Sequence, residues 1–173
     1  TVMSPKSWDC VRHAVGCGLA AVDAVMAGKA DNAFLAARPP GHHAEKTTAM
    51  GFCFINTAAV MARHAQSKHG AERVAIVDFD VHHGNGTQDI FEQDASVFYA
   101  STHQMPLFPG SGAKGEEGVG NICNAPLEPG AGTEDFRDAF RTRVLPALNA
   151  FAPDLLIISA GFDAHARDPL ANV

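Results

Sequence analysis

The chain has 173 residues, of which 46% are hydrophobic and 18% are charged, and its formal net charge is −6. This length supports a sizeable core in one globular domain, and the negative charge without a Lys/Arg cluster argues against nucleic-acid binding. No apolar run is long enough to span a bilayer, and no signal peptide is recognisable. The four cysteines form no CxxC pair, so we expect a reduced, cytoplasmic protein.

The N-terminal part predicts two helices and one short strand. Apolar residues at helical spacing predict a helix from an N-cap at Ser7 to Met26. Residues 33–37 are expected to form a short strand. Asn56 then caps a second helix, which stops at Gly70.

The remainder of the chain alternates strands with helices. Apolar, β-branched runs predict strands at 73–79, 97–101, 122–125 and 155–159. Helices are expected at 87–91 and 133–151, with Pro146 kinking the second. This alternation predicts an α/β fold with a mainly parallel sheet covered by helices on both faces. Without a repeat or a linker, 1–173 reads as one domain, and both ends look cut, so we expect it to be partial.

Polar residues follow three of the predicted strands. Residues 38–43 follow the first, 78–86 the second and 160–163 the last. In open parallel sheets, ligands bind beyond the carboxyl ends of the strands, and these loops are therefore expected to converge.

The second of these loops indicates a metal site. Side chains alternate along an extended chain, so Asp78, Asp80 and His82 point to the same side. Three such groups would be poorly solvated together without a cation. Asp80 and His82, with Asp163 from the last loop, fit a catalytic zinc site that keeps one position open.

Such a site needs a separate general base, because two carboxylates offset the charge of a divalent ion. The pair His42-His43 is the candidate. Asp78 could accept a hydrogen bond from one imidazole and Asn85 from the other, which would fix both tautomers.

Other histidines and cysteines have simpler interpretations. His13, His64 and His69 lie on predicted helices and are interpreted as surface residues or hydrogen-bonded core residues. Cys53 is expected to be a small buried packing residue near the site, and His103 a loop residue.

Four motifs stand in a fixed order: Arg38–Ala44, Gly51–Phe54, Asp78–Thr87 and Ser159–Asp163. Together they closely resemble the zinc-dependent histone deacetylase superfamily, which also contains acetylpolyamine amidohydrolases and acetoin-utilisation proteins. The Pro-Pro-Gly-His-His form, with Asn85 where many relatives carry Asp, looks like the class II branch.

The resemblance implies an arginase-like three-layer α/β sandwich and a zinc-dependent deacetylase. Its substrate would be N-acetyl-lysine in a protein or peptide, or a related acetylated amine such as an acetylpolyamine. The residues that match zinc ligands in this family are Asp80, His82 and Asp163. His43 matches the general base and His42 the neighbour that stabilises charge.

Further roles are implied by the same resemblance. Asp78 and Asn85 match the hydrogen-bond partners of the two histidines. The Gly51 carbonyl matches the acceptor for the substrate amide, and Phe52 and Phe108 match the walls of a channel for the acyl-lysine stem. Backbone carbonyls around Asp78 and Asp80, with Ser101, resemble a potassium site.

One family residue has no counterpart in the chain. The resemblance implies an oxyanion-stabilising Tyr in a Gly-Gly-Tyr motif after the third ligand, whereas the only tyrosine is Tyr99, upstream and within a predicted strand. A non-catalytic acyl-lysine or metal-binding remnant is therefore the alternative. A binuclear manganese ureohydrolase is less favoured, because it requires Asp at the position of Gly84 and a second Asp in place of His165.

Overall fold

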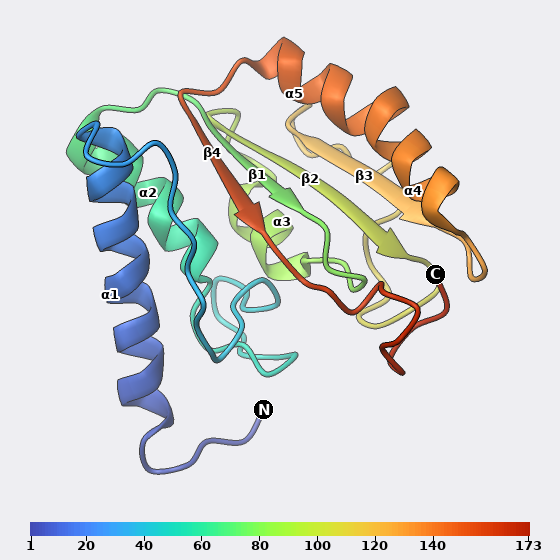
Figure 1. The fold of residues 1–173 in the computed structure, drawn as a ribbon, viewed down its shortest axis with the longest axis horizontal. Coiled ribbons are helices and arrows are strands. Elements are labelled where there is room, and N and C mark those ends of the chain that lie inside the picture. The colour runs from blue at the N-terminus through green and yellow to red at the C-terminus, as the bar shows by residue number, and fades with distance from the viewer.

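The computed structural model describes residues 1–173. One parallel sheet has the strand order β3-β2-β1-β4 (Figure 1). The strands are β1 Val74–Asp78, β2 Val97–Gln104, β3 Ile122–Leu127 and β4 Leu155–Ser159. The strands predicted for these segments are confirmed, although β2 is longer than expected. His103 consequently lies in a strand and not in a loop.

The helices are α1 Ser7–Met26, α2 Thr57–His69, α3 Asn85–Phe91, α4 Thr133–Ala139, the π-helical segment η1 Phe140–Val144 and α5 Leu145–Phe151. The cap of α2 is as predicted, since the Asn56 side chain accepts from the Ala59 N–H at 3.0 Å and Gly70 takes a left-handed conformation. Ser7, in contrast, is not a cap. Its hydroxyl accepts from the Ser4 N–H, and α1 begins without a side-chain cap.

The long helix expected over 133–151 is helical throughout, but its irregularity precedes the proline. The hydrogen-bond pattern widens to π-helical over η1, and Pro146 occupies the first turn of α5. Proline lacks an N–H, so it is tolerated where a new helical segment begins. The expected kink is thus a π-helical segment followed by a restart of the α-helix.

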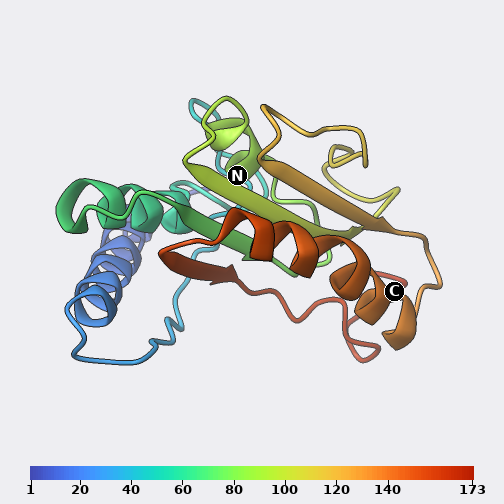
Figure 2. The same ribbon diagram turned by 90° about the horizontal axis from the view of Figure 1, so that it is seen from above.

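Two apolar cores lie on opposite faces of the sheet, because successive strand residues point to opposite sides. Val74 and Ile76 of β1 pack with the alanines of α2. Ala75 and Val77 pack on the other face with Val144 and the neighbouring helical residues of α4–η1–α5. The result is three layers, with helices on both faces of the sheet (Figures 1 and 2).

The strand expected at 33–37 is not formed. These residues run as irregular chain, and the Phe34 side chain is 82% exposed. A strand needs a partner for its backbone N–H and C=O groups, and this segment pairs with no strand of the sheet.

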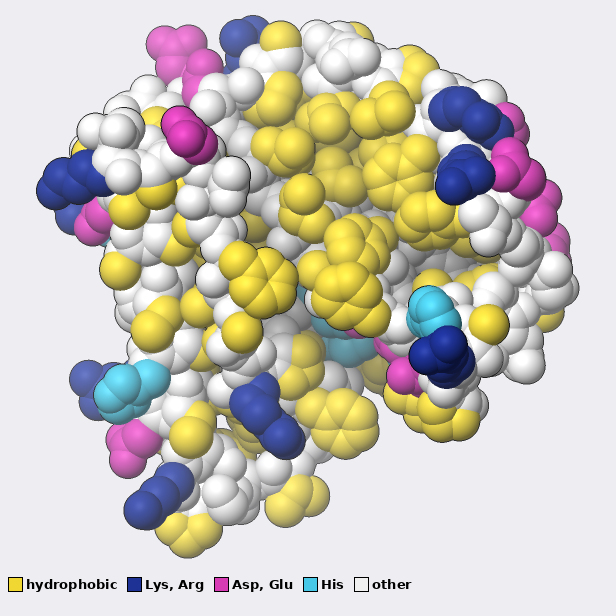
Figure 3. All heavy atoms as spheres, viewed as in Figure 1, with side chains coloured by type: hydrophobic (Ala, Val, Ile, Leu, Met, Phe, Trp, Pro, Cys, Tyr) yellow, Lys and Arg dark blue, Asp and Glu magenta, His cyan; other side chains and the backbone are white.

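The edge strand β4 leaves apolar surface uncovered. Leu156 and Ile158 are exposed on the face that α5 covers elsewhere, and Phe162 follows them. Figure 3 shows hydrophobic side chains gathered over this part of the molecule. No helix of the structure combines the length and the apolar character that crossing a membrane requires.

Candidate active site

The register of the sheet brings the carboxyl ends of β1 and β4 level with one another, and β2 continues past them to Gln104. Asp78 at the end of β1 is paired with Ser101 of β2 on one side and with Ser159 of β4 on the other. The segments that follow β1 and β4 therefore leave the sheet side by side. The Val81 N–H donates to Asp163 Oδ1 at 2.9 Å across 82 residues of sequence.

Asp80, His82 and Asp163 form one cluster, as the sequence predicts. His82 Nδ1 lies 3.1 Å from Asp80 Oδ1 and 2.9 Å from Asp163 Oδ2. One nitrogen and two carboxylate oxygens thus converge on a common point, with all three side chains half-buried. Asp78 does not join them, because its carboxylate is directed towards His42.

The electrostatics of this cluster favour a positive charge. Hydrogen bonds to Asp163 and Asp80 raise the pKa of His82 to about 9. Burial alone would raise the pKa of Asp163, but hydrogen bonds from His82 and from the Val81 N–H lower it to about 2. The donor set of one imidazole and two carboxylates suits a divalent metal, which would take the place of the imidazole proton.

His42 is paired with a carboxylate. Its Nδ1 donates to Asp78 Oδ2 at 2.9 Å, and its Nε2 lies 3.9 Å from Asp80 Oδ2. Burial would lower the pKa of His42, but the charge and the hydrogen bond of Asp78 raise it above its ordinary value. Asp78 is itself fully buried and accepts a second bond, at 3.3 Å, from the Tyr99 hydroxyl.

His43 is paired with a neutral amide, and the orientation of that amide is fixed. Asn85 Nδ2 donates to Glu45 Oε1 at 2.7 Å, so Asn85 Oδ1 faces His43 Nδ1 at 2.8 Å. An amide oxygen can only accept, and Nδ1 of His43 must therefore carry the proton. The free lone pair is then on Nε2. Glu45 is a residue that the sequence analysis missed, although it follows His43 by only two positions.

Because their surroundings differ, the pKa values of these two neighbouring rings shift in opposite directions. The ring centroids of His42 and His43 are 4.0 Å apart. Burial and then the charge of His42 lower the pKa of His43 to about 4. His43 is consequently a neutral proton acceptor at pH 7, whereas His42 has a raised pKa. A separation of this kind is typical of paired acid–base groups.

The predicted substrate-binding residues surround these histidines unequally. The Phe108 ring lies 5.1 Å from the ring of His43 and 6.4 Å from that of His82. Gly51 adopts a left-handed conformation, and a Cβ there would overlap the His43 ring. The Phe52 side chain is 77% exposed, and its ring makes no aromatic contact with either histidine. Cys53 is fully buried behind Gly51, as expected.

Nothing in the structure supports the potassium site implied around Asp78, Asp80 and Ser101. The Ser101 hydroxyl lies 2.9 Å from His103 Nδ1, in a buried polar network. His83, the second member of the His-His pair, faces the same network and bonds to Ser111 and Gln88. It points away from the Asp80–His82–Asp163 cluster, and burial lowers its pKa to about 4.

A binuclear centre gains no support either. A Cβ at Gly84 would overlap the Tyr99 hydroxyl and the Asp78 carboxylate. The position therefore has no room for the Asp side chain that a binuclear centre requires. His165 is exposed, and its Nδ1 accepts from the Arg167 N–H at 3.2 Å. Neither residue joins the cluster of ligating atoms.

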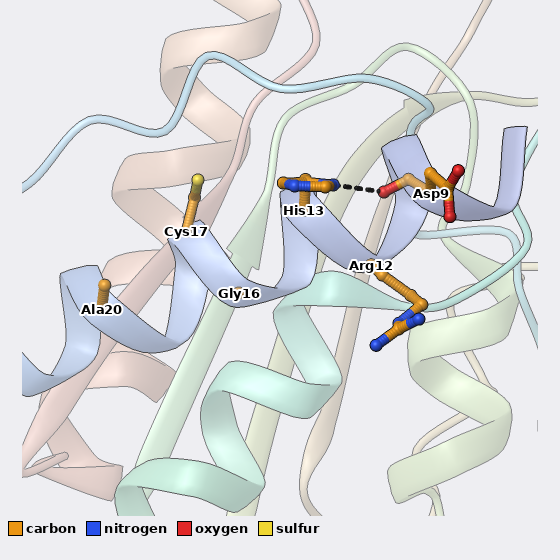
Figure 4. A pocket seen from close by; sticks show the side chains of 6 residues that line it. All are labelled: Asp9, Arg12, His13, Gly16, Cys17 and Ala20. Carbon is orange, nitrogen blue, oxygen red and sulfur yellow. Dashed lines mark hydrogen bonds between the residues drawn. The ribbon is translucent and has the colours of Figure 1, made fainter. Parts of the chain in front are cut away.

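A shallow pocket of about 410 Å³ lies on the outer face of α1, away from this site (Figure 4). Its lining comes from a single helix: Asp9, Arg12, His13, Gly16, Cys17 and Ala20. The His13 Nδ1 bonds to the Asp9 carbonyl at 2.7 Å. No second element brings polar groups to this pocket, and it has no convergent chemistry.

Comparisons with known proteins agree with the motif resemblance. The family described as the histone deacetylase domain matches residues 1–173. A histone deacetylase-like amidohydrolase of Pseudomonas aeruginosa is 48% identical over 176 residues, covering 99% of this chain and 46% of that protein. The chain spans about half the length of the curated relatives it matches.

Two solved structures resemble the chain closely. The crystal structure of the HDA15 HD domain has a TM-score of 0.90 and 47% identity, covering 94% of this chain and 49% of that one. An acetylpolyamine aminohydrolase from Burkholderia pseudomallei has a TM-score of 0.86 and 38% identity, covering 92% and 48% respectively. The expected arginase-like α/β fold is confirmed.

Proposed function

The chain belongs to the histone deacetylase domain family, and from this membership we propose that its protein is a zinc-dependent deacetylase. The substrate would be N-acetyl-lysine in a protein or peptide, or a related acetylated amine such as an acetylpolyamine. Residues 1–173 would supply part of a single catalytic domain. The observation that carries the proposal is the pair His42–His43, whose differently partnered rings lie beside the Asp80–His82–Asp163 cluster.

Asp80, His82 and Asp163 would hold the zinc ion. When bound, zinc supplies a Lewis acid that polarises the acetyl carbonyl and makes water more acidic. The Asp163 carboxylate is held in place before any ion binds, because it also accepts a hydrogen bond from the Val81 backbone N–H. Such support from the backbone limits the freedom of a ligand to rotate away.

His43 would act as the general base. Its Nε2 carries the free lone pair, since Nδ1 donates to the oriented amide of Asn85. Nε2 would take a proton from the attacking water and return it to the leaving amine. His42, held by the buried Asp78, would stabilise the negative charge that develops on the acyl oxygen.

The acyl-lysine stem would enter between Phe52 and Phe108. Phe108 contacts the edge of His43, so an aliphatic stem lying on it would present its amide to the base. The Gly51 carbonyl, which accepts only a weak bond from the Cys53 thiol at 3.4 Å, is available to accept the substrate N–H.

Two substitutions in the full-length protein test these roles. His43→Ala should lower deacetylation of an acetyl-lysine peptide by roughly 10²–10⁴ while zinc content is unchanged, as expected for a lost general base. Asp80→Ala should instead release the metal, as measured by elemental analysis of the dialysed protein. Near-normal turnover of the first variant, or full zinc content in the second, would refute the assignment.

A second candidate function is a non-catalytic module that binds acyl-lysine or metal. Within residues 1–173 the only tyrosine, Tyr99, is fully buried and donates to Asp78, so an oxyanion-stabilising tyrosine would have to come from outside these residues. Without an oxyanion donor, rates fall by about 10²–10³. If the full-length protein binds zinc and acetyl-lysine peptides but turns over neither acetylated peptides nor acetylpolyamines, this second function holds.

The cytoplasm is the proposed location, in keeping with four free cysteines. Fractionation of cells that express the tagged full-length protein tests it.

A further inference from the structure

A second cluster of ligating side chains lies far from the proposed active site, between α1 and α2. It consists of Asp23 on α1 and of His64 and His69 on α2. The two histidines are five positions apart and lie on either side of the aspartate, with ring centroids 5.8 Å apart. Sequence analysis did not reveal this cluster, because no sequence pattern brings Asp23 of α1 beside His64 of α2, which is 41 residues away.

The ring nitrogens of both histidines face the same carboxylate oxygen of Asp23. Asp23 Oδ1 lies 2.8 Å from His64 Nε2 and 2.7 Å from His69 Nε2. The other carboxylate oxygen, Oδ2, accepts from the Lys68 ammonium at 2.7 Å. Lys68 thus orients the carboxylate from its far side and leaves Oδ1 to the two imidazoles.

We propose that Asp23, His64 and His69 form a second binding site for a divalent transition-metal ion. Two imidazole nitrogens and one carboxylate oxygen are the donors that such ions select, whereas Mg²⁺ and Ca²⁺ prefer oxygen alone. The three side chains are half-buried, which leaves room for water to complete the coordination shell. Zn²⁺, Ni²⁺, Co²⁺ and Cu²⁺ are the ions that fit.

The end of helix α2 also favours a cation. His69 is the last residue of α2, where the helix ends at Gly70. The carbonyl groups at a helix C-terminus carry partial negative charge, which attracts positive ions.

The position of the cluster indicates a structural role for the metal. His69 lies five residues before the start of β1 at Val74, whereas Asp80 and His82 follow the carboxyl end of β1. Helix α1 is attached to the rest of the fold chiefly through α2, where Gly18 packs against Met61. An ion held by both helices would fasten α1 to α2.

The competing explanation is a set of hydrogen bonds without a metal. Both imidazoles can donate an N–H to Asp23 Oδ1, and in that case an added ion would gain nothing over the existing contacts. The two explanations differ in the number of metal ions bound and in the role of Lys68.

Zinc binding to the chain is therefore measured by competition with a chromophoric chelator, using five proteins. The wild type should bind two equivalents. His64→Gln/His69→Gln and Asp80→Asn/His82→Gln should each retain one, and the combination of all four substitutions should retain none. His13→Gln is the matched control for an exposed helical histidine and should retain both equivalents. Circular dichroism confirms that each variant is folded.

A single equivalent in the wild type, lost with Asp80→Asn/His82→Gln and unaffected by His64→Gln/His69→Gln, would overturn the proposal. The same result would leave the proposed function intact, so the two failures are distinguishable. In the Asp80→Asn/His82→Gln protein, zinc should also raise Tm by several degrees. Lys68→Met should tighten zinc binding at this site severalfold, because the ammonium no longer neutralises Asp23. An absent Tm shift, or unchanged affinity in Lys68→Met, would favour the hydrogen-bonded cluster.

Discussion

A carboxylate placed at position 85 should convert His43 from a weak base into a strong one. In Asn85→Asp, the new charge would face His43 Nδ1, which now lies 2.8 Å from a neutral oxygen. At an effective dielectric constant of about 20, opposite charges about 4 Å apart attract by about 4 kcal/mol, equivalent to about 3 pKa units. Because the buried carboxylate itself loses hydration, the pKa of His43 should rise by about 2 units from its value of about 4.

The substitution has to be combined with a second one. Asn85 Nδ2 donates to Glu45 Oε1, so aspartate alone would face a like charge. Glu45→Gln restores the donor, and the single variant Glu45→Gln is the matched control. The assay is a titration of the imidazole ¹⁵N and ¹H resonances in the metal-free chain, which requires no catalytic activity. If the pKa of His43 moves by less than about half a unit, the partner of this ring does not set its basicity.

The same change should alter how stability depends on pH. The pKa of His43 is about 4 when folded and 6.5 ordinarily, so the unfolded chain binds more protons between these values. Stability therefore falls as pH drops through this window. The loss is about 2 kcal/mol after allowance for solvent screening. Urea unfolding of the metal-free chain should show this loss in Glu45→Gln and little of it in the double variant.

Two further substitutions test the supports of the site. In Gly161→Ala a Cβ would overlap the Asp80 carboxyl group, whereas Gly115→Ala meets nothing within 4 Å; only the first should weaken zinc binding, by roughly 10–100-fold. Equal affinities in a chelator titration would show that Asp80 has room to move. Tyr99→Phe removes the hydroxyl that donates to Asp78 and should cost about 1–2 kcal/mol. Unchanged urea unfolding would mean that this buried bond is dispensable.

The site could be predicted from sequence wherever its members are close along the chain or follow strands. Asp80 and His82 stand two apart, and the strand that precedes them places them at the sheet edge. Their proximity to Asp163 could be predicted because the loops at the carboxyl ends of parallel strands converge. That Asp78 and Asn85 each partner one of the two histidines also followed, because each imidazole tautomer needs a partner, but the residues alone do not say which histidine takes which partner.

Other features depend on packing that no local pattern contains. Glu45 orients Asn85 through a side-chain contact across 40 residues, and a lone glutamate near a histidine carries no signal of this. The strand expected at 33–37 does not form, because β-propensity alone does not supply a neighbouring strand to pair with. His103 was misjudged because β2 extends beyond its apolar run to Gln104, where polar side chains find buried partners instead of water.

The register that aligns β4 with β1 also affects the order in which parts of the site form during folding. The cluster takes two ligands from the segment after β1 and its third, Asp163, from the segment after β4, and Asp163 reaches Val81 across 82 residues. Contacts of such long range form late, since the intervening chain must first be ordered. A nascent or refolding chain would therefore hold only two of its three ligands until the edge strand docks. If the cluster binds zinc as proposed, tight capture of the metal marks the completion of folding and does not initiate it.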